Sequence, residues 1–370
     1  MDDRLKNKHW IILSLSSIPL IMTLGNSMMI PILPLLEKEL NITSLQSSYV
    51  ITAYSIVAIF LIPVAGFLSD RFGRKKIIIP ALIITALGGL IAGLASWKMN
   101  EPYIIILLGR ILQGVGASGA MPIVLPYVGD LFKSNDEAST VLGAIETSNT
   151  IGKVLSPILG SFLAGFIWFL PFFAIPLFCM ISLVMVIFLV KTKESEEFIT
   201  FKKYWAYMKE AFQEHYRWLI AVFIIGAILM FILFGFLFYL STILEEKYHY
   251  DGIMKGVLLA IPLLALSLAA LITGKVIKDH LVVMITFFGI VLAGASVAVI
   301  PFLDALILLL GTFLVCGIGI GASLPSLDSL ITKSMKKSVR GMITSIYSAM
   351  RFIGVALGPP LIAILMKQDI

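Results

Sequence analysis

Long apolar segments separated by short polar ones run along the whole chain. Segments of about 20 apolar residues are long enough for an α-helix to cross a bilayer, and these are too uniformly apolar for barrel strands, in which apolar and polar residues alternate. The pattern therefore predicts an all-α membrane protein with eleven spans, at residues 10–34, 47–69, 77–97, 103–131, 138–165, 168–190, 218–243, 253–274, 281–301, 304–332 and 342–366.

Composition agrees with this pattern, because 59% of the 370 residues are hydrophobic and only 14% are charged. Soluble domains carry about 25% charged residues.

Cys179 and Cys316 lie in different apolar segments, so they indicate neither a disulfide nor a metal site. We expect no metal and no cofactor.

The positive charges predict how the chain is oriented. With the amino terminus in the cytoplasm, 20 of the 28 Lys and Arg residues fall in cytoplasmic segments. This bias explains the net charge of +6 without a nucleic-acid partner. We therefore expect a multi-pass protein of the cell membrane with a cytoplasmic amino terminus and a retained first helix.

Two similar halves are indicated by repeated motifs. Gly114, Gly116 and Pro122 in the fourth span match Gly317, Gly319 and Pro325 in the tenth, and IGKVLSP at 151–157 matches IGVALGP at 353–359. Such repeats are typical of duplicated transporter halves. We expect a bundle of six spans at 1–190, a cytoplasmic amphipathic linker at 191–217 and a second bundle of five spans at 218–370.

Charged residues inside the spans are candidates for function, because an intramembrane charge is costly unless it has a role or a partner. Arg110, Lys153 and Arg351 are such cations, and Glu146 is the one deep carboxylate. Glu146 is the candidate proton carrier, with Arg110 as its modulator. The alternative is that Glu146 is permanently paired with a cation and that Arg110 only binds backbone carbonyls. Asp328 is expected to be a solvated or capping group.

The segment GFLSDRFGRKK, at 66–76, resembles the signature loop of the major facilitator superfamily. The resemblance implies a gate in which Gly66 allows close helix packing, and Asp70 and Arg74 join Asp130 to latch the outward-facing state. It also implies two pseudo-symmetric helical bundles around a central substrate cavity. The family has twelve spans, so the last helix is expected to be missing from this sequence.

Two further segments carry the resemblance. LLGRILQGVGASG, at 107–119, is similar to the family motif that places Arg110 inside the membrane, and the kinked first span resembles the cavity-lining helix of drug exporters, with Asn26 in the cavity. GKVLSPILGS, at 152–161, partly resembles the antiporter motif, with Ser156 and Ser161 in place of two glycines and with Lys153 inserted. The helix pivots implied are Gly152, Pro157, Gly354, Gly358 and Pro359.

The resemblance implies proton-coupled efflux of small organic molecules or drugs by a monomer in a lipid bilayer, with protons as the coupling partner. An alternative is export of an anionic metabolite such as a catecholate siderophore, because three cations, Arg110, Lys153 and Arg351, would share the cavity with one carboxylate. An enzyme is disfavoured because the sequence lacks the HExxH, GxSxG and phosphate-loop motifs. A scaffold would not need charges inside the bilayer.

Overall fold

The computed structural model describes residues 3–132, 135–190, 201–276, 281–335 and 337–367. Every regular element in these ranges is a helix. The elements are α1 (Asp3–Ser27), η1 (Ile30–Ile32), α2 (Leu33–Leu40), α3 (Ser44–Phe72), α4 (Arg74–Lys98), α5 (Tyr103–Leu131), α6 (Asn135–Phe166), α7 (Leu170–Leu189), α8 (Phe201–Glu246), α9 (Gly252–Val276), α10 (Val282–Val299), η2 (Ile300–Phe302), α11 (Leu306–Ser334) and α12 (Lys337–Met366). The predicted all-helical fold is confirmed.

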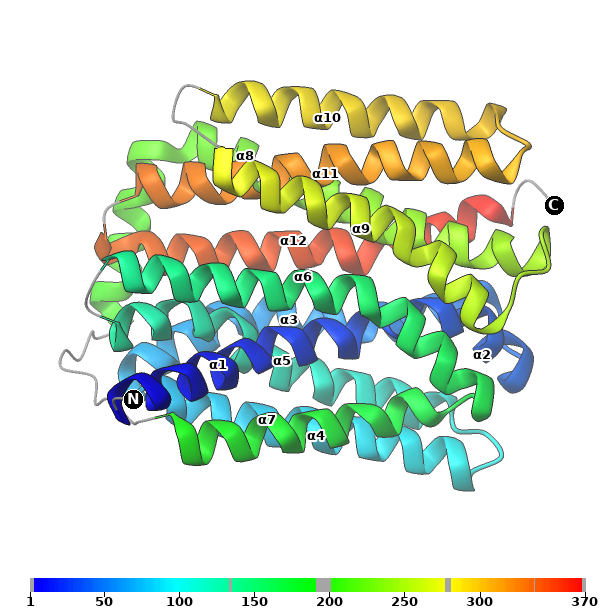
Figure 1. The fold of residues 1–370 in the computed structure, drawn as a ribbon, viewed down its shortest axis with the longest axis horizontal. Helices are drawn as coiled ribbons and strands as arrows, with labels where there is room; N and C mark the ends of the chain where they lie inside the picture. Colours follow the sequence, from blue (N-terminus) through cyan, green and yellow to red (C-terminus); the bar gives the residue numbers. More distant parts are fainter. Residues whose placement is uncertain (1–2, 133–134, 191–200, 277–280, 336, 368–370) are drawn as a thin grey trace.

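The long helices lie side by side along one direction, with the two chain ends at opposite ends of the bundle (Figure 1). Among the described residues, ten helices are long and apolar enough to cross a membrane. Helix α6 is more polar and is not one of the ten, although its 32 residues run alongside them. We call the end that carries the amino terminus the predicted cytoplasmic end, and the opposite end the predicted outer end.

The first predicted span is interrupted in the structure. Helix α1 ends at Ser27, a single 3-10 turn follows, and α2 completes the crossing. Pro31 and Pro34 occupy the first turns of η1 and α2, where a missing backbone N–H removes no helical hydrogen bond. The interruption leaves main-chain carbonyls at the end of α1 available to other side chains.

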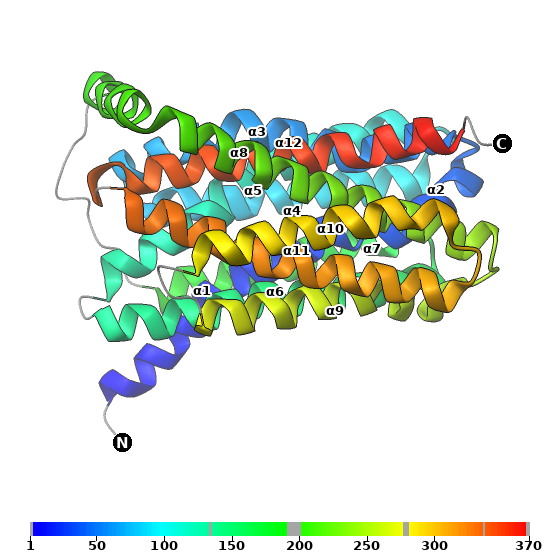
Figure 2. The same ribbon diagram turned by 90° about the horizontal axis from the view of Figure 1, so that it is seen from above.

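The seventh predicted span is longer than expected, because α8 begins at Phe201 and continues without a break to Glu246. Figure 2 shows the first turns of α8 end-on, at an angle to the rest of the helix. The predicted linker, 191–217, therefore joins this span as one helix from residue 201 onward, and 191–200 lie outside the described residues. The amphipathic role of this segment stays a prediction.

The two groups of helices repeat one packing pattern. Helix α1 packs on α6, and α5 packs on α3 and α4; in the second group, α8 packs on α12, and α11 packs on α9 and α10. The two groups meet along α3 with α12 and along α6 with α9. We call the α1–α7 group the N-half and the α8–α12 group the C-half.

Matched glycines explain why the packing repeats. A Cβ atom at Gly114 would collide with a carbonyl of α3, and one at Gly317 would collide with a carbonyl of α9. Gly116 lies in the same way against α4, and Gly319 against α10. Small residues let membrane helices approach closely, so the motif matched in the sequence marks equivalent helix crossings in both halves.

We predict that Gly116→Ala destabilises the protein, by about 1–3 kcal/mol, because the added methyl group meets the backbone of α4 and forces two helices apart. Thermal unfolding of the purified protein in detergent measures this. Gly311→Ala is the matched control, since nothing lies within 4 Å of a Cβ atom there. Equal unfolding temperatures for the two variants would contradict the prediction.

Candidate functional site

Arg110 is fully buried in the N-half, where α1, α3 and α5 meet. Its guanidinium donates hydrogen bonds to the Val50 carbonyl at 2.9 Å, the Gly25 carbonyl at 3.2 Å, Asn26 Oδ1 at 2.8 Å and Gln113 Oε1 at 2.5 Å. Gly25 lies in the last turn of α1, whose carbonyls form the negative end of the helix dipole. Neutral acceptors thus stabilise the charge of Arg110.

The hydrogen bonds described for Arg110 do not include Glu146, and its predicted role as a modulator of Glu146 stays a prediction. The Tyr54 ring covers the guanidinium at 4.7 Å, and among the described residues no carboxylate forms an ion pair with Arg110. Asn26, predicted to line the substrate cavity, is also buried and accepts one of these hydrogen bonds. Arg110 therefore joins three helices of one half, as in the backbone-binding alternative.

A second group of charges comes from side chains of α6, α11 and α12. Lys153 Nζ is 3.9 Å from Glu146 Oε1 on α6, and Arg351 on α12 is 3.9 Å from Asp328 Oδ1 on α11. The charges of the two pairs also act on one another, since Lys153 and Arg351 repel and each is attracted by the acid of the other pair. We call Glu146, Lys153, Asp328 and Arg351 the interior charge cluster.

Asp328 changes the charge balance expected from the sequence. Arg110 lies in its own cluster, so two cations and two carboxylates form the interior charge cluster, rather than three cations and one carboxylate. In both pairs the acid is the more exposed member: the Glu146 and Asp328 side chains are 52% and 50% exposed, and those of Lys153 and Arg351 are 19% and 25% exposed. Asp328 is the acid that the sequence-based charge count did not include, and the preference of the cavity for anions stays a prediction.

Two polar residues that the sequence analysis did not select position Glu146. Asn149 Nδ2 lies 3.4 Å from both carboxylate oxygens of Glu146, and the Thr23 hydroxyl donates to Asn149 Oδ1 at 2.6 Å. Because the Asn149 oxygen is occupied by Thr23, its amide nitrogen faces Glu146. The spacing of three residues between Glu146 and Asn149 on a helix was the available signal.

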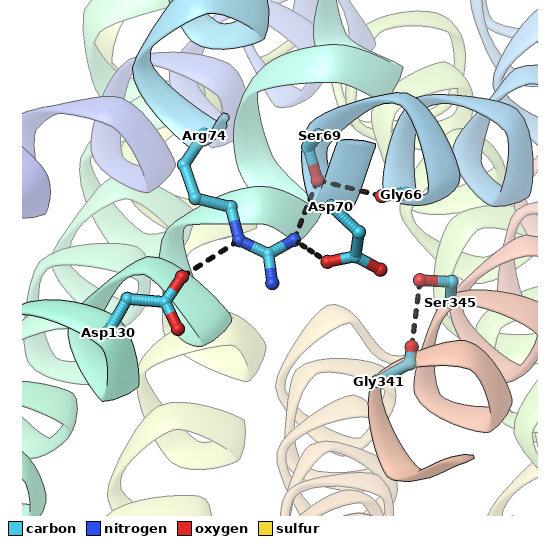
Figure 3. A network of polar contacts seen from close by, with 7 residues as sticks. All are labelled: Gly66, Ser69, Asp70, Arg74, Asp130, Gly341 and Ser345. Carbon is cyan, nitrogen blue, oxygen red and sulfur yellow. Dashed lines mark hydrogen bonds and ion pairs between the residues drawn. The ribbon is translucent and has the colours of Figure 1, made fainter. Parts of the chain in front are cut away.

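The predicted gate residues form one cluster at the predicted cytoplasmic end (Figure 3). Arg74 pairs with Asp70, and its Nε is 3.1 Å from Asp130 Oδ2. Ser69 Oγ accepts a further hydrogen bond from Arg74 at 2.7 Å. Gly73 joins α3 to α4 with φ of 97°, a conformation that favours glycine. The charged groups come from α3, α4 and α5, all in the N-half.

Gly66 brings this cluster against the C-half. A Cβ atom there would lie 3.1 Å from Ser345 Oγ on α12. The contact requires close approach of α3 and α12, as a gate between the halves would. Whether the cluster opens and closes during transport stays a prediction.

The predicted pivots lie at crowded helix crossings. A Cβ atom at Gly152 would be 3.1 Å from a carbonyl of α1, and one at Gly358 would be 2.8 Å from a carbonyl of α8. Gly354 also lies against the backbone of α8. Pro157 and Pro359 lie inside the continuous helices α6 and α12. These positions permit tight packing, and bending at them stays a prediction.

The chain is similar to known transporters along nearly its whole length. Residues 15–359 match the Major Facilitator Superfamily. The chain is 53% identical over 361 residues to the bacillibactin exporter of Bacillus subtilis, covering 96% of this chain and 90% of that protein. It is 26% identical over 356 residues to multidrug resistance protein 2 of the same organism, covering 94% and 86%.

Solved structures share the fold. A bacterial homologue of the human lysosomal transporter Spinster, in an inward-facing and unoccupied conformation, aligns with a TM-score of 0.78 at 15% identity, covering 98% of this chain and 83% of that one. The human organic anion transporter MFSD10 aligns with a TM-score of 0.74 at 16% identity, covering 96% and 93%. From its sequence match and its fold, the chain is a multi-pass membrane transporter that belongs to the major facilitator superfamily.

Proposed function

We propose that the protein exports a small organic anion of the catecholate-siderophore class from the cytoplasm. The observation that carries the proposal is that Lys153 from the N-half and Arg351 from the C-half are close enough to act on each other within one interior charge cluster. The 53% identity to a bacillibactin exporter supports both the cargo class and the direction. The bias of Lys and Arg supports a cytoplasmic amino terminus, and one chain supplies the whole cluster, as a monomer requires.

The ion pairs of the cluster are loose enough for a cargo to replace them. Both have N–O distances of 3.9 Å, beyond hydrogen-bond length, whereas Lys8 and Glu137 on the protein surface approach to 2.7 Å. An anionic group that reaches Lys153 therefore replaces an ion-pair contact to Glu146 that is longer than a hydrogen bond. The cations gain a stronger partner because a bidentate or short charge-assisted contact is worth more than a long one.

Glu146 is the proposed proton-binding group. When it is ionised, it partly neutralises Lys153; when it is protonated, Lys153 is left to the cargo. By linkage, a proton on Glu146 and an anion on Lys153 favour each other's binding. Binding of an anionic cargo should therefore strengthen as the pH falls.

The second candidate is antiport of a cationic drug against protons. It is favoured by the greater exposure of Glu146 and Asp328, which a cargo meets before the cations, and by the similarity to multidrug resistance protein 2. A cation competes with protons for the carboxylates, so its binding should weaken as the pH falls. The sign of the pH dependence separates the two candidates.

We predict that Lys153→Gln lowers export of an anionic cargo about tenfold or more, because one charge-assisted contact of about 1.5–3 kcal/mol is lost. The measurement is transport of labelled bacillibactin and of ethidium into inverted membrane vesicles. Lys98→Gln, at the far end of α4, is the control. Strong ethidium transport that Lys153→Gln leaves unchanged, with no bacillibactin transport by the parent, would support the cationic candidate.

We predict that Glu146→Gln retains binding of the anion but loses most of its pH dependence, because Gln reproduces the neutral acid. Binding of labelled bacillibactin by the purified protein at several pH values measures this. Glu101→Gln, an exposed position between α4 and α5, should leave the profile unchanged. A profile that Glu146→Gln does not alter would assign proton binding elsewhere, with Asp328 as the next residue to test.

We predict that Asp70→Asn lowers the transport rate while cargo affinity stays within about twofold, because the substitution removes a charge from the gate and leaves the interior charge cluster intact. Rates in vesicles and binding in detergent measure the two quantities separately. Asp304→Asn, in an exposed ion pair at the predicted outer end, is the control. A normal rate for Asp70→Asn contradicts the gate assignment.

A further inference from the structure

We infer that Lys38, Glu245 and Lys255 form an outer latch, an ion cluster that joins the two halves and closes the predicted outer end of the cargo path. Lys38 belongs to α2 in the N-half, whereas Glu245 and Lys255 belong to α8 and α9 in the C-half. The inference concerns the conformational cycle and does not depend on which cargo is carried.

Glu245 lies between the two lysines. Its Oε1 is 2.5 Å from Lys38 Nζ, and its Oε2 is 2.5 Å from Lys255 Nζ. The Glu245 and Lys255 side chains are 9% and 5% exposed, whereas that of Lys38 is 63% exposed. Each carboxylate oxygen thus has its own ammonium partner, and one of these two contacts crosses between the halves.

The two halves also touch each other close to the outer latch. Beside it, the Ser241 hydroxyl of α8 donates to the Ile30 carbonyl of η1 at 3.1 Å, and both residues are buried. Further along, a Cβ atom at Gly256 on α9 would lie 2.5 Å from the Pro157 carbonyl on α6. The N-half and C-half therefore touch at two more places near this end.

The acids of the interior charge cluster are much more exposed than the buried residues of the outer latch. Glu146 and Asp328 are about half exposed, although they lie inside the bundle, whereas Glu245 and Lys255 at the predicted outer end are nearly inaccessible. This conformation is closed at the outer latch. A cargo that leaves through the predicted outer end requires the contact between Lys38 and Glu245 to break.

The arrangement allows the contact between the halves to be tested alone. Removing Lys38 leaves Glu245 paired with Lys255 inside the C-half, so no buried charge loses its last partner. Lys247 and Asp304 provide the control, because they form an ion pair at the same end with both members in the C-half, at 3.5 Å.

The test measures how fast a cysteine at Ile30 reacts with a membrane-impermeant maleimide added to intact cells. Cys179 and Cys316 are first replaced by serine, and the reporter Ile30→Cys is then combined with variants of Lys38. Opening of the latch exposes residue 30, which is buried in this conformation. Ser241→Cys, a nearly isosteric change, serves as a second reporter in case Ile30→Cys perturbs the fold.

We expect Lys38→Gln to accelerate labelling about tenfold, which corresponds to 1.4 kcal/mol between the closed and open states. Lys38→Glu should accelerate it further through repulsion by Glu245, and Lys38→Arg should leave it slow. Lys247→Gln should match the parent. Equal labelling rates for parent and Lys38→Gln with both reporters, or equal acceleration by Lys247→Gln, would overturn the outer latch.

Discussion

A charge inside a membrane bundle must find its partner within the protein, because lipid supplies none. Four cations of the described structure meet that constraint in three ways. Arg110 uses main-chain carbonyls and neutral side chains, Lys153 and Arg351 use carboxylates, and Lys255 shares Glu245 with Lys38. The choice of partner determines which helices are held together and how firmly.

These three kinds of partner differ in which helix movements they permit. Arg110 has four hydrogen bonds and joins helices of one half, so it favours a rigid N-half. The interior charge cluster has longer contacts, which suit exchange of partners. The outer latch has short contacts, but the one that joins the halves ends on the exposed Lys38. Rigid halves with replaceable contacts between them are what alternating access requires.

The sequence predicted the helices and their repeat well, because both follow from local and repeated requirements. A span needs a long apolar segment, and a close helix crossing needs a small residue such as Gly116 or Gly319. It also predicted that Asp70, Arg74 and Asp130 meet. Binding of Arg110 to backbone carbonyls was one of two alternatives from the sequence, because the Gly25 carbonyl depends on where α1 ends. The pairing of Asp328 with Arg351 was not predicted, because it depends on the rotation of neighbouring helices.

The balance of the interior charge cluster has an energetic consequence. Two cations and two ionised carboxylates sum to zero, so the empty protein can change conformation without moving net charge across the bilayer. A cargo with two negative charges, bound together with the proposed proton on Glu146, would add one net negative charge to the outward step. The cell interior is electrically negative, and each negative charge that leaves across 100 mV gains about 2.3 kcal/mol. For an anionic cargo, the membrane potential alone would therefore favour export.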